Sequence, residues 1–343
     1  MEAGNLSDVD VGEIGEFGLI ERLRRALPPA GDRVTLSIGD DAAVWRAGDR
    51  FALATTDTLV AGVHFLPGCV DWRDVGWKSL AVNISDIAAM GGEPAVALVT
   101  LCLPSGTAVE TVDALYAGIG EGARAYGVDV AGGDIVASPV LTITVALYGT
   151  AARRADGTPA ILRRDRAVAG DAIAVTGWLG GSAGGLRSLR DRDEESPSGI
   201  ALIARHMRPR PRIDAGRAAV AAGVCCAIDI SDGLLQDLGH VCESSGVAAD
   251  VWLPRIPIEP ALIERYPGDA AMLAATGGED YELILVAPES ALAATGAALG
   301  TPLAIIGRVR AGAGRARLLD VDDREIDVSR AGWDHLKRAG GSA

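Results

Sequence analysis

Apolar and polar positions alternate regularly along the first half of the chain. Phe51–Thr56 is a short, mostly apolar run that predicts a strand. In Asp74–Met90, apolar side chains recur every three or four positions, which predicts a helix. In Val140–Tyr148, apolar residues alternate one by one with Thr and Ala, so this is the clearest predicted strand. The sequence therefore predicts alternating strands and helices in the first half of the chain.

Local signals indicate where these elements begin and end. A loop, Asp57–Pro67, is expected after the first strand. Thr107-Ala-Val-Glu110 has the spacing of a capping box, which predicts a second helix that ends near Gly127. Ala151–Arg166 is rich in Arg, Gly and Pro, and we place a change of domain there.

The second half alternates again. Strands are expected at Ala172–Thr176, Ala227–Ile230 and Leu283–Val286, and a helix at Gly233–Ser244. Arg190–Ser198 is charged and polar, so we expect a mobile loop. Because 343 residues exceed what one ordinary core holds, the sequence predicts an α/β protein of two domains, residues 1–150 and 151–343.

Composition narrows the cellular setting. Hydrophobic residues make up 49% and charged residues 23%, which is the balance of a globular protein. The longest clear apolar run, Ala95–Leu103, is far shorter than the roughly 18 residues of a membrane span. The start of the chain lacks the basic and apolar segments of a signal peptide. We therefore expect a cytoplasmic protein without a membrane partner.

Net charge and cysteines exclude further classes. A formal charge of −14 argues against nucleic acid as a partner, because binding to phosphate backbones needs a basic face. The five cysteines include no CxxC pair and no zinc spacing. Cys225 and Cys226 are adjacent in an apolar stretch and are expected to be reduced core residues, with a redox pair as the alternative.

Carboxylates recur where strands or turns meet loops. Mg²⁺ prefers oxygen ligands and is usually shared between carboxylates and substrate phosphates, so several such loops suit more than one ion. Hydroxyl groups nearby add further oxygen ligands. The carboxylates are Asp40, Asp41, Asp57, Asp86, Asp134, Asp229 and Asp232, and the hydroxyls are those of Thr55, Thr56 and Ser231.

Each carboxylate also has a structural interpretation. Gly39-Asp40-Asp41 is by itself more typical of a turn, and Asp232 before Gly233 is compatible with a helix N-cap. Asp86 lies inside the predicted helix and continues a polar stripe from Ser79 and Asn83. A solvated face would carry Lys, Glu and Arg, so we favour a functional role for Asp86.

Two glycine-containing segments each have two possible roles. No P-loop motif occurs, but Gly177–Gly185 follows a predicted strand and precedes a helix, so it is either an anion-binding loop or a hinge. In Gly277–Glu282, an acidic turn, Glu279 either supports the turn or faces a cationic substrate group. No residue near His64 in the sequence completes a Ser/His/Asp triad or a zinc site, which favours a structural role for His64.

Taken in order, segments along nearly the whole chain resemble the thiamine-monophosphate kinase family. Any one of them would be a weak signal, and their combination is specific. They are Gly15–Ile20, Ile38–Ala42, Thr56–Phe65, Lys78–Pro94, Gly132–Asp134, Thr176–Leu186, His206–Arg212, Ile228–Gly233, Gly277–Glu282 and Gly332–His335.

The resemblance implies a fold and a reaction. The family is similar in fold to aminoimidazole ribonucleotide synthetase, with an N-terminal α/β domain that dimerises through its sheet and a C-terminal α/β domain. ATP would lie between the domains and phosphorylate thiamine monophosphate to thiamine diphosphate. We therefore expect a homodimer that uses several Mg²⁺ ions and direct in-line transfer.

The resemblance also assigns roles by position. Asp57, Asp86 and Asp134 would be catalytic. Nucleotide positions correspond to Tyr116, Gly133, Asp134, Arg164 and Ser231. Substrate positions correspond to His64, Glu279 and Trp333. Metal positions correspond to Asp41, Thr55, Thr56, Asp57, Asp86, Asp134, Asp229 and Asp232. Arg163 and Arg166 are close enough to Arg164 that the sequence does not decide which of the three meets the nucleotide.

Two rival functions stay open at this point. Another ATP-using member of the same superfamily is the nearer one, although no cysteine precedes Cys69 to serve selenophosphate synthesis. A regulator that binds metal or nucleotide without turnover is the other. Acceptor-dependent release of ADP distinguishes both rivals from the kinase.

Overall fold

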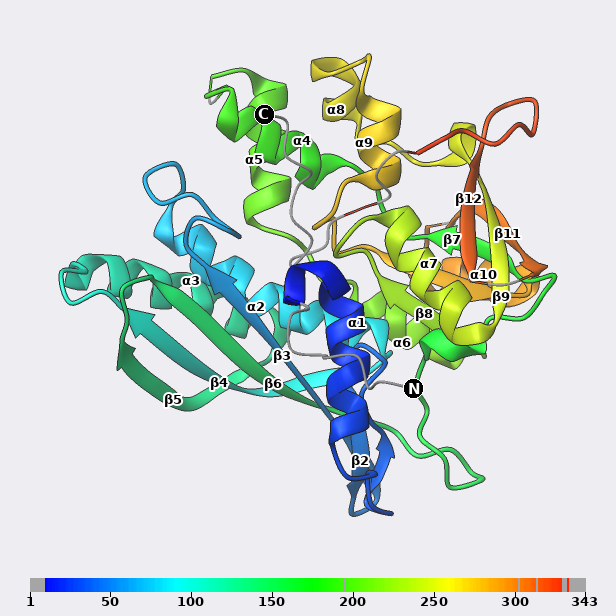
Figure 1. The fold of residues 1–343 in the computed structure, drawn as a ribbon, viewed down its shortest axis with the longest axis horizontal. Coiled ribbons are helices and arrows are strands. Elements are labelled where there is room, and N and C mark those ends of the chain that lie inside the picture. The colour runs from blue at the N-terminus through cyan, green and yellow to red at the C-terminus, as the bar shows by residue number, and fades with distance from the viewer. Residues whose placement is uncertain (1–9, 194, 302, 313, 329–331, 333–343) are drawn as a thin grey trace, which may run out of the picture.

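A computed structural model describes residues 10–193, 195–301, 303–312, 314–328 and 332. Two sheets dominate these residues, one from each half of the chain (Figure 1). The first has the strand order β1-β2-β3-β6-β4-β5, with β4 and β5 parallel and its other neighbours antiparallel. Its strands are β1 (Val34–Leu36), β2 (Ala43–Ala47), β3 (Arg50–Val60), β4 (Glu93–Leu103), β5 (Asp129–Ala137) and β6 (Thr142–Ala151).

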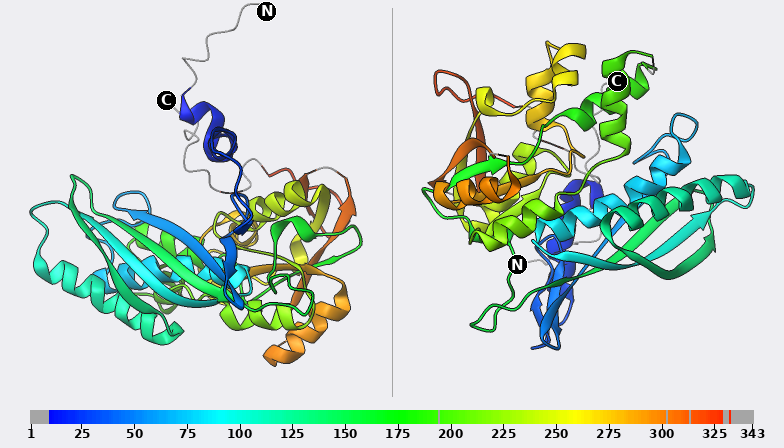
Figure 2. Two further views of the ribbon diagram at one scale, coloured as in Figure 1. Left: turned by 90° about the horizontal axis from the view of Figure 1, so that it is seen from below. Right: turned by 180° about the vertical axis from the view of Figure 1, so that it is seen from behind.

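Three helices accompany the first sheet. They are α1 (Val11–Ala26), α2 (Trp72–Ala89) and α3 (Val109–Tyr126). Helices α2 and α3 cover one face of the sheet, whereas α1 stands away from it (Figure 2). Along β6, inward residues such as Ile143 and Val145 are buried against these helices, while Thr144 and Tyr148 point to the uncovered face. We call the uncovered side the open face.

The second sheet has the order β12-β9-β11-β7-β10-β8, with only β9 and β12 parallel among its described strands. Its strands are β7 (Ala172–Val175), β8 (Cys226–Asp229), β9 (Val247–Trp252), β10 (Leu283–Ala287), β11 (Ala304–Ala311) and β12 (Arg315–Leu319). Its helices are α4 (Gly181–Arg190), α5 (Pro197–Met207), α6 (Ile213–Ala221), α7 (Leu234–Ser245), α8 (Pro260–Arg265), α9 (Ala270–Thr276) and α10 (Glu289–Leu299), with short 3-10 helices η1 (Arg164–Arg166) and η2 (Leu253–Arg255).

Helix α2 joins the two halves. It packs on β3 and α3 within the first half and also contacts α6 and β8 of the second. Most of its residues are buried, including polar ones such as Lys78 and Asn83. A helix enclosed on all sides would usually be apolar throughout, so the polar residues of α2 need partners inside the molecule.

Two glycines allow α2 and α3 to approach closely. A Cβ at Gly76 would lie 1.9 Å from the carbonyl oxygen of Leu115, and one at Gly118 would lie 1.7 Å from that of Arg73. Real Cβ atoms do not come this near to backbone atoms, so any side chain would push the helices apart. The sequence therefore fixes the spacing of this helix pair by omitting side chains at the crossing.

We expect Gly118→Ala to lower the free energy of unfolding by about 2–3 kcal/mol because the helices must separate. Gly120→Ala on the same helix is the matched control, since its Cβ would meet only the flexible end of Arg124, at 3.4 Å. The control should be neutral or slightly stabilising, because alanine favours helix. Urea denaturation of both variants tests this, and equal stabilities would contradict the close-packing argument.

The α/β class with two sheets is as predicted, and the main predicted helices and strands exist. One boundary differs in a way that matters for the site. Strand β3 continues to Val60 because Asp57 and Thr58 pair with Val145 and Thr144 of β6. Asp57 is therefore held in a strand and not in the predicted loop.

Three smaller predictions are wrong. Thr107 does not cap α3, whose N-cap is Ala108 without a side-chain hydrogen bond. Cys225 is exposed, and only its neighbour Cys226 is buried. The predicted loop at Arg190–Ser198 is shorter, since α5 begins at Pro197. No helix in the described ranges has the length and apolar character needed to cross a bilayer.

Candidate functional site

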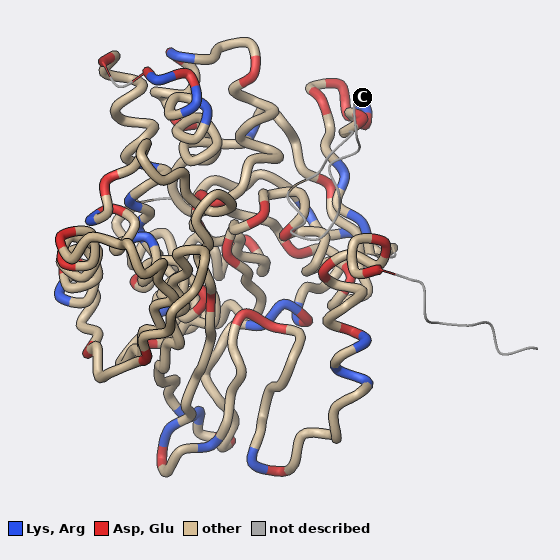
Figure 3. The backbone as a smooth tube through the Cα atoms, turned by 60° about the vertical axis from the view of Figure 1, so that its left-hand side comes forward, with Lys and Arg blue, Asp and Glu red and all other residues tan. Residues whose placement is uncertain are grey.

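A cavity of about 750 Å³ lies between the two halves of the chain. Its walls come from β3, α2, α4, the loop after β8 and the turn before β10. Acidic positions gather near the middle of the molecule (Figure 3). Seven predicted site residues line the cavity, namely Asp57, His64, Asp86, Asp229, Ser231, Asp232 and Glu279.

Three carboxylates from distant parts of the chain converge, and two of them, Asp86 and Asp229, line this cavity. Oxygen atoms of Asp41, Asp86 and Asp229 all lie within 4.8 Å of one another. Asp41 precedes β2, Asp86 lies on α2, and Asp229 ends β8. The cluster therefore forms only when the two halves of the chain pack together.

Hydroxyl groups orient two of these carboxylates. Thr55 Oγ1 on β3 donates to Asp86 Oδ2, and Ser85 Oγ on α2 donates to Asp229 Oδ2 at 2.6 Å. The second bond crosses from one half of the chain to the other. Thr55 thus lies beside the cluster as predicted, whereas Thr56 occupies the opposite face of β3 and is exposed.

Asp57 is positioned by the polar stripe of α2. Its backbone N–H donates to Asn83 Oδ1 at 3.0 Å, and Asn83 Nδ2 donates to the Ser79 carbonyl at 3.1 Å. Ser79 in turn donates to the Gly76 carbonyl. Ser79 and Asn83 are buried, so this part of the stripe ties β3 to the helix and only Asp86 reaches the cavity.

The cluster is strongly anionic. Burial, followed by the charges of Asp57, Asp229 and Asp41, raises the pKa of Asp86 well above its usual value. Burial and the charge of Asp41 raise the pKa of Asp229 to about 7. The neighbouring carboxylates therefore disfavour ionisation of Asp86 and Asp229, as expected where buried like charges lack counter-charges.

Arg164 supplies part of the missing positive charge. Its guanidinium pairs with Asp41 and lies 3.9 Å from Asp40. Its neighbours Arg163 and Arg166 both pair with Asp165 instead. Of the three arginines that the sequence left open, Arg164 is the one beside the cluster.

The donor set fits divalent magnesium. Oδ2 of Asp41 is buried and has no hydrogen-bond partner among the described residues. All three clustered ligands are carboxylate oxygens, which hard cations such as Mg²⁺ prefer to nitrogen or sulfur. One arginine does not balance the surrounding carboxylates, so bound cations would remove a repulsion that the protein alone leaves in place.

Magnesium should therefore raise the melting temperature more at pH 7.5 than at pH 5.5. Carboxyls with raised pKa values, such as Asp40 and Asp229 at about 7, bind extra protons when folded. Their stabilising contribution is complete below the unfolded pKa of about 4 and is lost as the pH rises through about 7. Cations bind the deprotonated carboxylates. The stabilisation by magnesium is therefore largest at a pH where these groups have lost their protons.

The difference between magnesium and chelator is the readout, measured by thermal denaturation at both pH values. Burial lowers the pKa of His206 to about 3 and that of His240 to about 4, and these residues destabilise the fold at acid pH. Their contribution is common to both conditions and cancels in the difference. An equal magnesium effect at pH 5.5 and 7.5 would contradict a carboxylate site.

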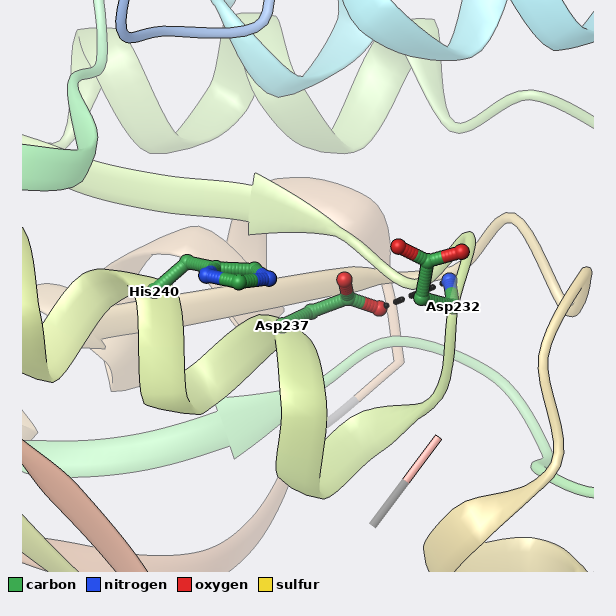
Figure 4. Close-up of side chains that lie close together, drawn as sticks. All are labelled: Asp232, Asp237 and His240. Carbon is green, nitrogen blue, oxygen red and sulfur yellow. Dashed lines mark hydrogen bonds between the residues drawn. The ribbon is translucent and has the colours of Figure 1, made fainter. Parts of the chain in front are cut away.

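Asp237 shapes the loop that carries Ser231 and Asp232 (Figure 4). Its Oδ2 accepts hydrogen bonds from the backbone N–H groups of Ser231, Asp232 and Gly233 at 3.0–3.1 Å. The N-cap of α7 is Gly233, so the alternative that Asp232 is merely a helix cap is wrong. Asp232, Asp237 and His240 bring ligand atoms within 4.8 Å, but Asp237 is already committed to the loop.

Two amides of the Gly177–Gly185 loop are already occupied within the protein. Gly180 N–H and Ser182 N–H donate to the carboxylate of Asp280 at 2.6 and 3.1 Å. Asp280 belongs to the Gly277–Glu282 turn, so the loop and the turn brace each other. The anion-binding interpretation of these two amides is therefore wrong.

His64 and Glu279 both face the cavity. Nδ1 of His64 accepts a hydrogen bond from Val60 N–H at 3.0 Å, which fixes the ring. Glu279 sits in the left-handed region with φ of 64°, and its N–H donates to the Ser231 carbonyl at 2.7 Å. The turn is therefore anchored to the loop that follows β8. This anchoring fixes the position of Glu279, as expected for a residue that contacts a ligand.

Three predicted nucleotide residues lie away from the cavity. Asp57, Val145, Val99 and Gly133 are in register across β3, β6, β4 and β5, which separates Asp57 from Gly133 by about 14 Å. Asp134 follows on the opposite, open face of the sheet. Tyr116 is a half-exposed residue of α3. Trp333 is outside the described residues.

Comparison with known proteins gives the family. Residues 39–151 match AIR synthase related protein, N-terminal domain, and residues 168–318 match AIR synthase related protein, C-terminal domain. The thiamine-monophosphate kinase of Aquifex aeolicus (strain VF5) is 35% identical over 328 residues, covering 94% of this chain and 99% of the relative. That of Salmonella typhimurium is 38% identical over 333 residues, covering 94% and 98%.

The chain belongs to the thiamine-monophosphate kinase family. A solved structure described as AaThiL complexed with AMPPCP and TMP matches with a TM-score of 0.84 at 34% identity, covering 96% of this chain and 99% of the other. Thiamine-monophosphate kinase from Stenotrophomonas maltophilia K279a matches with a TM-score of 0.72 at 38% identity, covering 88% and 95%. The predicted family, fold class and enzyme class, a kinase, are confirmed.

Sequence reasoning missed several residues that this kinase family member places beside the cavity. Ser85 and Asp237 act through hydrogen bonds to segments that sequence alone does not bring together. Lys78 was detectable, because a lysine between the apolar positions of a helix needs a buried partner. His206 belongs to the matched segment His206–Arg212 but offered no signal of its own.

Proposed function

We propose that this protein transfers the γ-phosphoryl group of ATP to thiamine monophosphate, which gives thiamine diphosphate and ADP. The carrying observation is that oxygen atoms of Asp41, Asp86 and Asp229 converge beside the cavity between the two halves, which Asp86 and Asp229 line. A relative of 34% identity is described in complex with AMPPCP and TMP, which supports the same pair of substrates here. The cavity of about 750 Å³ is large enough for two small substrates.

Metal ions form part of the proposal. Asp41, Asp86 and Asp229 would hold Mg²⁺, with Thr55, Asp57 and Asp232 as further ligands from the resemblance. Thr56 lies on the opposite face of β3 and is left out of this set. When bound, Mg²⁺ would neutralise charge on the donor and acceptor phosphates. The chain's own task is to hold carboxylates at fixed positions, which Thr55 and Ser85 achieve through their hydrogen bonds.

The acceptor requires no strong general base. A phosphate monoester is already ionised near neutral pH, so positioning and charge compensation dominate in-line transfer. His64 agrees with this, because its Nδ1 already accepts a backbone hydrogen bond. We assign His64, Glu279 and Trp333 to the acceptor, and Ser231 and Arg164 to the nucleotide.

A homodimer completes the assignment. Tyr116, Gly133 and Asp134 belong to the same proposed nucleotide site, yet Gly133 lies about 14 Å from Asp57 within one chain. A second copy packed on the first sheet would supply them. Residues 1–150 would then bind metal and form the dimer, residues 151–343 would complete the site, and the protein would act in the cytoplasm.

The test is ADP release from ATP and Mg²⁺ with and without thiamine monophosphate, with the product identified by mass. Acceptor-dependent ADP matched by an equal amount of thiamine diphosphate is the expected result. A folded protein that binds ATP but gives no acceptor-dependent ADP would overturn the proposal. That outcome would favour a different acceptor or a binding role.

A further inference from the structure

Glu279 has two buried partners that the proposed reaction does not account for. Lys78 Nζ lies 2.9 Å from Glu279 Oε1, and His206 Nδ1 lies 3.4 Å from Glu279 Oε2. Lys78 is 1% exposed, whereas the Glu279 side chain is 26% exposed and lines the cavity. One face of the carboxylate is thus held from behind while another faces the ligand space.

The two partners come from different halves of the chain. Lys78 is on α2 and His206 is near the end of α5. His206 also lies 2.9 Å from Ser182 Oγ at the start of α4. Burial and the nearby Lys78 charge lower the pKa of His206 to about 3, so its imidazole is neutral and Lys78 carries the balancing charge.

The segment after His206 fixes this arrangement to both halves. Trp77 Nε1 donates to the Pro209 carbonyl at 2.8 Å, and Arg208 donates to Asp74 and Glu121 at 2.9 and 2.6 Å. These contacts reach α2 and α3. The segment therefore holds His206 at a fixed distance from the helix that carries Lys78.

The other end of the segment holds the turn itself. Arg212 Nε donates to Glu282 Oε2 at 2.6 Å, and Thr176 Oγ1 donates to the same oxygen at 2.6 Å. Glu282 is 3% exposed and ends the turn that carries Glu279. His206 and Arg212 thus hold the turn at Glu279 and at Glu282.

We propose that Lys78 and His206 are positioning residues, which hold Glu279 so that the enzyme selects acceptors with an amino-substituted, cationic heterocycle. This inference rests on the proposed function. An unsupported carboxylate in this acidic cavity would be repelled toward solvent and would bind any cation loosely. A carboxylate fixed by Lys78 presents its remaining lone pairs in one direction, which favours a matched hydrogen-bond donor.

The test is a double-mutant cycle with Lys78→Met, Glu279→Gln and the combined variant. We expect Lys78→Met to raise the KM for thiamine monophosphate about 10-fold or more, with kcat and the KM for ATP nearly unchanged. The combined variant should be no worse than Glu279→Gln alone, because Lys78 acts through Glu279. Arg217→Met, which removes a surface pair with Glu93, is the control and should match the wild type.

Folding is checked within the same cycle. Glu279→Gln alone leaves the Lys78 charge buried without its partner and is the variant at risk, whereas the combined variant removes both charges. His206→Asn, which keeps a donor near the Nδ1 position, should retain a lower acceptor KM than His206→Leu. Circular dichroism and melting temperature establish that each variant is folded before kinetics are compared.

Three outcomes decide the inference. Additive effects of Lys78→Met and Glu279→Gln, or equal losses toward ATP and the acceptor, would overturn it and leave Lys78 as a purely structural residue. Wild-type protein without acceptor-dependent turnover would overturn the proposed function and this inference together. Turnover by the wild type with a non-additive cycle confined to the acceptor KM would support both.

Discussion

Asp86→Asn is expected to abolish turnover while making the magnesium-free protein more stable. An oxygen of Asp86 lies within 4.8 Å of oxygens of Asp41 and Asp229, and burial together with three neighbouring carboxylates raises the pKa of Asp86 well above the usual value. Its charge is therefore unfavourable for the fold by itself. Asparagine has nearly the same shape and can still accept the hydrogen bond from Thr55.

The expected changes in kcat and in the free energy of unfolding are each large enough to be measured. Loss of one central ligand should lower kcat by about 10³-fold or more, equivalent to about 4 kcal/mol in the barrier. Removal of one uncompensated buried charge should raise the free energy of unfolding by about 1 kcal/mol or more in chelator at pH 7.5. Steady-state kinetics and urea denaturation measure the two effects on the same preparation.

Asp71→Asn is the matched control on the same helix. Asp71 is the exposed N-cap of α2 and accepts from Arg73 N–H at 2.8 Å, a role that asparagine fills equally well. Both activity and stability should stay near wild type. An Asp86→Asn protein that is inactive and also less stable than wild type would mean that Asp86 supports the fold, and would remove it from the proposed metal site.

Local features of the sequence predict much of the fold. The three-to-four spacing over Asp74–Met90 corresponds to α2, and the one-by-one alternation over Val140–Tyr148 corresponds to most of β6. Both patterns are local, because the spacing of apolar residues along the sequence follows the period of a helix or of a strand. The end of β3 was missed because pairing with β6, and not local propensity, extends that strand through Asp57.

The site was predictable as a set of residues but not as a geometry. The recurrence of aspartates at element ends identified Asp86 and Asp229, yet the bond between Ser85 and Asp229 joins positions 144 residues apart. Periodicity carries no information about such pairs. Asp237 is a similar case. In the sequence it is an ordinary polar position of a predicted helix, and only the structure shows its hydrogen bonds to the Ser231–Gly233 loop.

A charge on the open face of the first sheet is expected to convert the protein to an inactive monomer. Tyr148 of β6 and Leu98 of β4 are each 38% exposed there, and every residue of β5 is exposed. Such an apolar face with an open strand edge is typical of a surface that pairs with another chain. Tyr148→Lys should therefore give monomers in light scattering and lower turnover by about 100-fold.

Val321→Lys is the matched control, because Val321 is 82% exposed and lies beyond β12, far along the chain from the first sheet. It should stay dimeric and active. A Tyr148→Lys protein that is monomeric with full turnover would show that one chain carries a complete site. That result would remove the dimer from the proposed mechanism.

Mixing two inactive variants tests the dimer without a substitution designed to separate the subunits. Asp134 lies on the open face of the first sheet, whereas Asp86 lies on the helix that covers the other face, so we expect Asp134 and Asp86 to serve one reaction from different subunits. Asp86→Asn and Asp134→Asn homodimers should each be inactive. After subunit exchange, a mixed dimer has one site with both substitutions and one with neither, so about a quarter of wild-type activity should return. If each site belonged to a single chain, every site in the mixture would keep one substitution and no activity would return.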